Sequence, residues 1–276
     1  PPRSTLFPYT TLFRSKTAPN FEYQASMAGH EMINPRTITK RPGAMEDAYR
    51  ALRTVPGVVS RNDMNTQLYI RGSSPDQNLI LYDGLEVTNP NRLMVMMGGG
   101  VSLVNPDILQ AMELVPAGFE VDHGNKMSAL VQIANREGSR SDVKLNLNAT
   151  LLNSRAVAEG PLAGGSGSWL IAVRRSFYDL LANAVTNQRY IFPFYYDAHA
   201  KLAFDFSSQH KLSAFYTHLG EGTKMLNVES EQLDLLNAGR GHIAGLRWTS
   251  MISPKVVAHL LDRKSTRLNS SHRIRS

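Results

Sequence analysis

The side chains with which this sequence could carry out chemistry are its histidines, serines, methionines and arginines, and their spacing excludes the common catalytic sites. The eight histidines are scattered, and no pair has the His-Glu-x-x-His spacing of a zinc peptidase. The absence of cysteine excludes a thiolate metal site and a disulfide framework. The stretch 164–168 lacks both the context of a nucleophilic serine and the lysine of a phosphate-binding loop. We therefore expect no enzyme, no metal site and no cofactor.

The positive charge of the chain does not indicate a nucleic-acid partner. Arg174 and Arg175 are adjacent, but no aromatic residues alternate with basic ones around them as they would in a nucleic-acid-binding surface. The net charge is +7, and six of these charges lie in residues 1–15 and 264–276, which contain no acidic residue. Residues 5–15 and 264–272 resemble translations of a pair of synthetic sequencing adapters, so we expect 1–15 and 264–276 to be foreign to the natural protein.

The composition is that of a globular chain, but it does not exclude a membrane protein that crosses the bilayer with β-strands. Hydrophobic residues make up 42% of the 276 residues, and no stretch approaches the 18 apolar residues of a membrane-spanning helix. A membrane-spanning β-barrel crosses with alternating strands, so its signal escapes an average of hydropathy. The spacing of apolar residues along the sequence therefore decides between a soluble globular protein and a membrane-spanning β-barrel.

The first half of the chain reads as a small α+β module. Met45, Ala48, Leu52 and Val55 share one face of a predicted helix over 44–55, and Pro56-Gly57 ends it. A second short helix is predicted to begin at Pro106-Asp107. Short apolar runs bounded by turn residues predict strands at 67–71, 78–82, 112–115 and 129–138. Helix and strand signals mix without a regular βαβ period, which favours α+β.

After Gly138 the apolar residues recur with a period of two. In 143–151 the odd positions are apolar and the even positions polar, and in 196–206 the even positions are apolar. Strands of about 9–11 residues with this alternation are typical of outer-membrane barrels, although a soluble β-sandwich alternates as well. Several aromatic residues lie near predicted strand ends, as membrane-girdle residues would: Trp169, Tyr195, Tyr196, Tyr216 and Trp248. The seven strand candidates are 143–151, 153–160, 168–175, 195–206, 210–219, 241–251 and 254–261.

The order of the motifs in the first half carries a resemblance to a known family. The segments RPGAMEDAYRALRTVPGVV (41–59), LYIRGSSPDQNLILYDGLEV (68–87), NPDILQAMELVPAGF (105–119) and SALVQIANREG (128–138) resemble the plug domain of TonB-dependent outer-membrane receptors. The sequence departs from the family pattern at 119–123. The resemblance implies a plug domain over 35–140 and the first strands of a transmembrane barrel over 141–263. Plugged barrels close with about 22 strands, so we expect the chain to be part of a longer protein.

The resemblance also implies roles for particular residues. Arg71 and Arg136 match arginines that face glutamates of the barrel wall, and we expect their partners in strands beyond this chain. Three plug loops are candidates for contact with a ligand, through Asn62, Asp63, Asn65, Ser73, Asp76, Gln77, Asn91 and Arg92. Met94, Met96 and Met97 could hold Cu(I) through their thioethers, but we favour a loop packed against the inside of the barrel.

The implied function is uptake through the outer membrane of a Gram-negative bacterium. A TonB–ExbB–ExbD complex would supply the energy through a segment upstream of residue 35, and outer-membrane lipid would surround the barrel. The transported nutrient would be a siderophore, cobalamin or metal chelate rather than a glycan. The alternative from a different class is a secreted or surface β-sandwich adhesion module with an α+β N-terminal domain.

Overall fold

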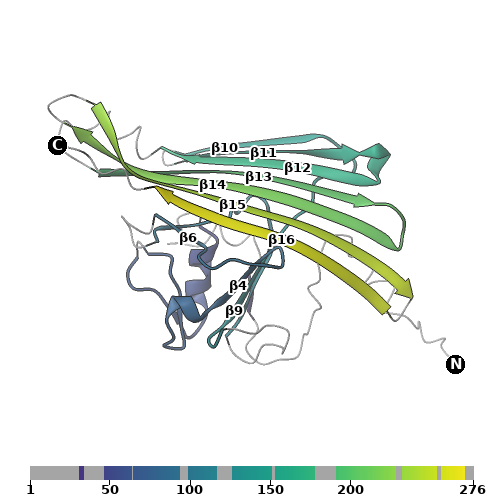
Figure 1. The fold of residues 1–276 in the computed structure, drawn as a ribbon, viewed down its shortest axis with the longest axis horizontal. Coiled ribbons are helices and arrows are strands. Elements are labelled where there is room, and N and C mark those ends of the chain that lie inside the picture. The colour runs from purple at the N-terminus through teal and green to yellow at the C-terminus, as the bar shows by residue number, and fades with distance from the viewer. Residues whose placement is uncertain are drawn as a thin grey trace.

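The protein is described by a computed structural model, which covers residues 31–33, 47–63, 65–93, 99–116, 126–150, 153–177, 191–227, 232–253 and 256–270. These residues form two parts (Figure 1), an N-terminal module and a large antiparallel sheet that we call the wall. The expected foreign segment 1–15 and the methionines at 94, 96 and 97 lie outside the described residues.

The N-terminal module is built on a five-stranded mixed sheet with the strand order β1-β8-β9-β4-β5. Strands β4 and β9 are parallel, and every other neighbouring pair in this sheet is antiparallel. Two small ribbons, β2–β3 and β6–β7, stand beside it. The strands are β1 (Glu31–Ile33), β2 (Val58–Val59), β3 (Tyr69–Ile70), β4 (Leu79–Tyr82), β5 (Leu85–Glu86), β6 (Asn91–Arg92), β7 (Val101–Ser102), β8 (Leu109–Val115) and β9 (Leu130–Asn135).

The helices of the module are shorter than the sequence pattern predicts. The described part of the predicted helix 44–55 contains the 3-10 helix η1 (Tyr49–Thr54), and a further 3-10 turn, η2, spans Pro75–Gln77. The prediction of a second helix at Pro106-Asp107 is wrong, because these residues form a turn that leads directly into β8. Asn105 explains the turn, since its side-chain oxygen accepts a hydrogen bond from the backbone N–H of Asp107 at 3.0 Å.

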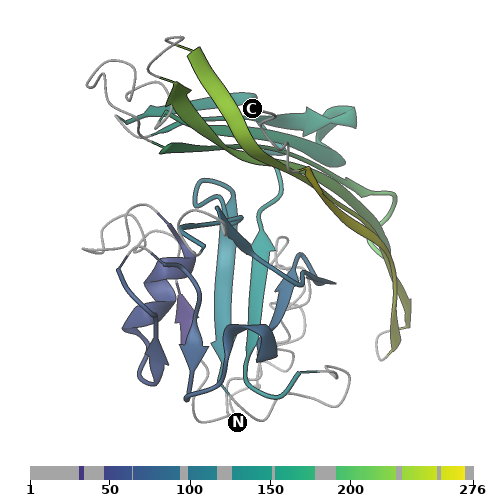
Figure 2. The same cartoon turned by 60° about the vertical axis from the view of Figure 1, so that its left-hand side comes forward.

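The wall consists of seven strands that pair antiparallel in chain order, β10 to β16. Figure 2 shows this sheet arching over one side of the module. The seven described wall strands form one sheet with the module on one face, so the wall is not a β-sandwich and the alternative is wrong. The strands are β10 (Lys144–Ala149), β11 (Asn153–Leu162), β12 (Gly167–Ser176), β13 (Ile191–Asp205), β14 (His210–Asn227), β15 (Gln232–Ser253) and β16 (Val256–Ser270).

All seven predicted wall strands are present, and the later ones are longer than predicted. Strands β14 and β15 have 18 and 22 residues. Strand β16 continues to Ser270 and so includes part of the segment 264–276 that was expected to be foreign. The short turn β11–β12 contains the 3-10 turn η3 (Ala163–Gly165).

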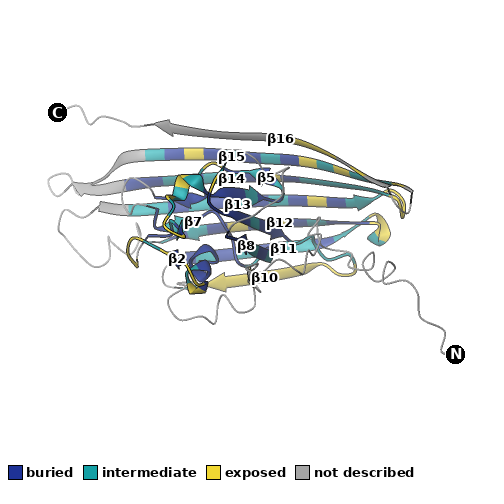
Figure 3. Cartoon of the chain, turned by 90° about the horizontal axis from the view of Figure 1, so that it is seen from below, coloured by how far each residue is buried: buried dark blue, intermediate teal, exposed yellow. Residues whose placement is uncertain are grey.

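The two faces of the wall have opposite character. Leu202 is 51% exposed on the outer face, whereas its neighbours Lys201 and Ala203 are 5% and 3% exposed on the inner face. The same alternation runs along the neighbouring strands and is visible as alternating bands in Figure 3. Exposed apolar residues on the outer face include Ile171, Val173, Phe206, Tyr216, Leu246 and Trp248. The apolar face therefore points away from the module, and the polar face is buried by it.

The module packs against the inner face of the wall through its own hydrophobic core. Phe215 of β14 and Ile243 of β15 join the cluster that contains Leu52, Tyr82 and Ile133 of the module. A second cluster joins Ile108 of the module to Val157, Leu170 and Ala172 of the wall. No helix in the described residues is long and apolar enough to cross a membrane.

The connection from module to wall depends on a glycine. A Cβ atom at Gly138 would lie 2.0 Å from the carbonyl oxygen of Trp169 in β12. No side chain fits between two backbones at that distance, so the segment after β9 can lie against the wall only with glycine at this position.

Candidate functional site

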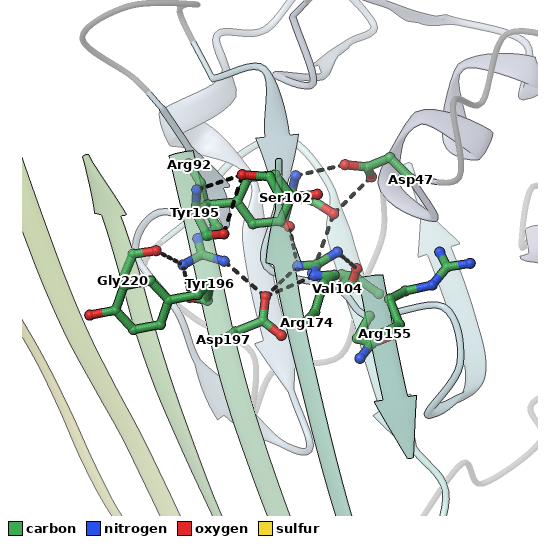
Figure 4. Close-up of polar contacts among 12 residues, drawn as sticks. Asp47, Arg92, Ser102, Val104, Arg155, Arg174, Tyr195, Tyr196, Asp197 and Gly220 are labelled. Carbon is green, nitrogen blue, oxygen red and sulfur yellow. Dashed lines mark hydrogen bonds and ion pairs between the residues drawn. The ribbon is translucent and has the colours of Figure 1, made fainter. Parts of the chain in front are cut away.

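The interface between the module and the inner face of the wall holds a group of buried charges, shown in Figure 4. At its centre Asp197 of β13 accepts hydrogen bonds from Arg92 Nη1 at 2.9 Å and from Arg174 Nε at 2.8 Å. Arg92 comes from β6 of the module and Arg174 from β12 of the wall, and all three side chains are about 4% exposed. We call these three residues the Asp197 cluster.

Backbone carbonyls satisfy the remaining guanidinium donors of the Asp197 cluster. Arg92 Nη2 donates to the carbonyls of Tyr196 at 2.8 Å and Gly220 at 2.7 Å, both in the wall. Arg174 donates in the opposite direction, to the carbonyls of Val104 at 3.2 Å and Ser102 at 3.1 Å in the module. Each part of the molecule thus inserts an arginine into the other, and both cations share one carboxylate.

The Asp197 cluster is extended on both sides. The ring of Tyr195 lies beneath both guanidinium groups, 5.3 Å and 5.1 Å from their central carbons. Asp47, just before η1, accepts hydrogen bonds from the backbone N–H and the hydroxyl of Ser102, each at 2.7 Å. Helix η1 is therefore connected through Ser102 to the arginine that enters from the wall.

A second buried charge pair lies where the turn between β4 and β5 meets the wall. Lys201 Nζ of β13 donates to Asp83 Oδ1 at 3.1 Å and to the carbonyl of Asn135 at 2.6 Å. The backbone N–H and side-chain amide of Asn135 also donate to Asp83. Burial raises the pKa of Asp83, but the ammonium of Lys201 and the hydrogen bonds from Asn135 outweigh it, so the pKa lies below its ordinary value.

A third group of contacts fixes the segment that joins module and wall. Arg136 pairs with Glu159 of β11, and the backbone N–H of Ser139 donates to the same carboxylate at 3.1 Å. Arg140 donates to Asp205 at the end of β13 at 2.7 Å. A further ion pair joins Arg155 of β11 to Asp107 of the module at 3.0 Å.

This arrangement seats the module against the wall. Buried ion pairs are costly to break, because removing one partner leaves the other charge without compensation. Among the described residues, no three His, Asp or Glu side chains are grouped so that they could hold a metal ion. The contacts that the described interface contains are ion pairs, hydrogen bonds and apolar packing.

The two arginines singled out from the sequence have different surroundings. Arg136 contacts the wall, and its partner Glu159 lies within this chain rather than in strands beyond it. Arg71 is exposed, with a positive φ of 51°, and forms no ion pair with the described residues. The described wall does not reach Arg71, so its expected role remains a prediction.

The eight loop residues proposed to face a ligand separate into two groups. Asn62, Asp63 and Asp76 are exposed, and Ser73 and Gln77 are half-buried. Asn65, Asn91 and Arg92 are buried, which differs from the expectation. Asn91 accepts a hydrogen bond from the hydroxyl of Thr66 at 2.9 Å, and Arg92 enters the Asp197 cluster. Asn91 and Arg92 thus contact other parts of the protein, and a ligand-facing role for the eight residues remains a prediction.

The sequence analysis did not identify the wall residues of this interface. Arg174, Asp197 and Lys201 are charged residues on the polar face of strands whose other face is apolar. A charged side chain in such a position faces either solvent or a buried partner of opposite charge. Only the fold shows that the module covers these side chains. Tyr195 was expected in a membrane girdle but faces inward, because its position on β13 is odd, like that of Asp197.

Comparison with known proteins identifies the module. Residues 25–129 match the family model described as TonB-dependent Receptor Plug Domain. No curated protein sequence matches the chain.

Solved structures resemble the whole described fold. The ferric enterobactin receptor PfeA of Pseudomonas aeruginosa has a TM-score of 0.63 and 16% identity, over 89% of this chain and 42% of its own. The siderophore receptor PirA of Acinetobacter baumannii has a TM-score of 0.64 and 15% identity, over 92% of this chain and 41% of its own. The copper transporter OprC has a TM-score of 0.58 and 12% identity, over 88% of this chain and 37% of its own.

These matches agree with the arrangement of module and wall. The chain spans about two fifths of the length of the receptors it resembles. Both parts occur in the order that the motifs predict, the plug first and the antiparallel strands after it. Residues 25–129 therefore match a TonB-dependent receptor plug domain, and the chain as a whole shares the fold of a plug followed by the first barrel strands of the receptors it resembles.

Proposed function

We propose that the protein is an outer-membrane importer that takes up a scarce metal chelate, such as a siderophore or cobalamin, with energy from a TonB–ExbB–ExbD complex. The wall would form part of a barrel in the outer membrane of a Gram-negative bacterium. The plug would close the barrel until substrate and energy together move it.

One observation carries this proposal. The wall exposes its apolar face, and its polar face is covered by the module through buried ion pairs. A soluble protein rarely exposes a continuous apolar sheet face, whereas a transmembrane barrel must present one to lipid. A module seated by charges can also be released without unfolding the barrel, as an importer requires.

The buried charges favour a plug that rearranges over one that is fixed permanently. Well-packed apolar side chains often stabilise an interface as much as a buried ion pair does. The stability of an interface with buried charges, however, depends strongly on each charge keeping its partner. Asn91, the neighbour of Arg92 on β6, accepts a hydrogen bond from Thr66 in the segment before β3. Strand β6 therefore connects the Asp197 cluster with that segment of the module. A ligand that moves this loop would act directly on the cluster.

The substrate class is supported by the similar proteins and by the exposed loops. Two of those proteins are siderophore receptors and one is a copper transporter, which supports a metal or its chelate as the cargo. Asn62, Asp63 and Asp76 provide exposed polar groups on the module that could contact a chelate. The segment on which TonB would pull is expected before residue 35, where the structure describes only residues 31–33.

Uptake by cells tests the proposal. A strain that expresses the full-length protein as its only candidate receptor should take up a radiolabelled ferric siderophore or cobalamin from a panel of such compounds. Deletion of tonB should abolish uptake while binding to the cells remains. Failure of every chelate in the panel, or uptake that continues without TonB, would contradict the proposed function.

A further inference from the structure

Two histidines face one another on the outer surface of the wall. His218 of β14 and His242 of β15 are directly opposite in the strand register. Their Nδ1 atoms are 3.3 Å apart, and their ring centres are 4.7 Å apart. The hydroxyl of Tyr216 lies 2.6 Å from His242 Nδ1. These three side chains lie on the opposite face from the plug, and none of them takes part in the interface described above.

The strand alternation fixes the outward direction of this group. Thr217 and Ile243, the neighbours of the two histidines along their strands, are each 2% exposed against the plug. Tyr216 is 46% exposed, so the group is open to the surroundings of the wall. Tyr196 lies across Gly220, and its ring centre is 5.8 Å from that of His218. Neighbouring rings therefore hold the imidazoles on both sides.

The distance between the two nitrogens suits a divalent transition metal. With metal–nitrogen bonds of about 2.05 Å, two nitrogens 3.3 Å apart subtend an angle of roughly 107° at the metal, close to tetrahedral. Imidazole is a preferred ligand of Zn²⁺, Ni²⁺ and Cu²⁺, and affinity is highest for Cu²⁺. We propose that His218 and His242 form a surface site for a divalent transition metal, with the Tyr216 hydroxyl as an additional oxygen ligand.

The position along the strands gives the site access to water. The outward residues between Tyr196 and Phe206 on β13 are apolar, and this stretch is about 33 Å long, or roughly 25 Å high at the usual strand tilt. That height equals the apolar band of an outer-membrane barrel, with aromatic residues at both borders. His218 is opposite Ala198, close to the Tyr196 border. The site therefore lies at the edge of the apolar band, within two residues of its Tyr196 border, where hydrated metal can approach from the water side.

One nearby charge opposes metal binding. Arg240 is exposed on β15, two residues before His242 and on the same face of the strand. Its positive charge repels a second cation and lowers the affinity of the site. Removing this charge should strengthen binding without changing either ligand.

Copper titration of the full-length protein in detergent tests the proposal. The wild type should bind one Cu²⁺ whose electron paramagnetic resonance spectrum shows coupling to nitrogen. The double variant His218→Ala/His242→Ala should bind at least about tenfold more weakly, since even loss of a second-shell partner costs a metal site that much. The control is His210→Ala, which removes another β14 histidine, adjacent to Trp248 and Ser250, and should leave the signal unchanged.

The variants distinguish this site from copper bound elsewhere. Arg240→Gln should bind Cu²⁺ more tightly than the wild type. A signal that persists in the double variant places the copper elsewhere and overturns the proposal, as does loss of the signal in His210→Ala or the absence of any signal in the wild type. All of these side chains lie on the wall away from the plug, so heat-modifiable gel mobility should show that each variant still forms a barrel.

Discussion

Replacement of Asp197 by alanine should loosen the plug more than any other single change at the interface. The substitution leaves Arg92 and Arg174 buried without their shared carboxylate. Removing one partner of a buried ion pair costs about 3–5 kcal/mol. That free energy corresponds to a roughly 150- to 5,000-fold shift in the ratio of seated to unseated plug. The backbone carbonyls that also accept from the arginines keep the expected cost within this range rather than doubling it.

Limited proteolysis of the full-length protein in outer membranes measures this shift. Cleavage of the plug follows the fraction of unseated molecules when opening and closing are fast relative to the protease. The matched control is Asp205→Ala, which removes the partner of Arg140, because those two side chains are 27% and 24% exposed. A partly exposed pair contributes at most about 1 kcal/mol, so this control should raise cleavage no more than about fivefold.

The comparison between the two aspartates can refute the reasoning. If Asp197→Ala and Asp205→Ala raise cleavage equally, burial of the Asp197 cluster does not seat the plug. A double-mutant cycle with Arg92→Ala isolates the pair itself, since residues in direct contact show a coupling energy and independent residues do not. Heat-modifiable mobility should confirm that the barrel remains closed in every variant.

Three further changes test other parts of the interface. Asp83 has a lowered pKa in the folded protein, so the stability it contributes is present above its unfolded pKa of about 3.9 and is lost as the pH falls through the lower folded value. The protease resistance of the wild type relative to Asp83→Asn should therefore be constant from about pH 7 to 5 and decline below about pH 4. A difference that instead declines above pH 5 would contradict this assignment. Glu159→Ala removes the acceptor for Arg136 and the Ser139 N–H and should cost about 1–3 kcal/mol, measured as faster hydrogen exchange over 136–143. The control is Glu137→Ala, which removes only a partly exposed ion pair with Arg140. Unchanged exchange in Glu159→Ala would show that the pair does not fix this segment. Gly138→Ala places a methyl group against the Trp169 carbonyl and should lower the free energy of unfolding by about 1–3 kcal/mol, measured by thermal denaturation. A variant as stable as the wild type would mean that the backbones at Gly138 and Trp169 are further apart than the structure places them.

The sequence predicts the wall well because its signal is local. Alternation along 196–206 assigns Leu202 to one face and Lys201 to the other, and the structure confirms both positions. A period of two needs no knowledge of distant residues. The strand ends were underestimated at β14 and β15, where small and polar residues such as Gly222 and Asn237 interrupt the alternation while backbone pairing continues.

The interface could be predicted only in part because its partners are far apart in the chain. Arg92 and Asp197 are separated by 105 residues, and nothing in either segment indicates the other. The resemblance to plug domains singled out Arg136, which ends a strand two residues before Gly138, but it placed the partner beyond the chain. The pair His218 and His242, 24 residues apart, escapes a search for metal motifs, because these motifs assume ligands on one helix or one loop.

Collision of lipid-soluble oxygen with spin labels along β13 tests the central claim most directly, that the apolar face of the wall meets lipid while the plug covers the other face. The chain has no cysteine, so single cysteines can be introduced and labelled from position 198 to 203 without background. Labels at Ala198, Ala200 and Leu202 should show high oxygen accessibility, and labels at His199, Lys201 and Ala203 should be shielded from oxygen and from a water-soluble relaxing agent. Oxygen accessibility that is equal at all six positions, or highest at the second set, would contradict the account.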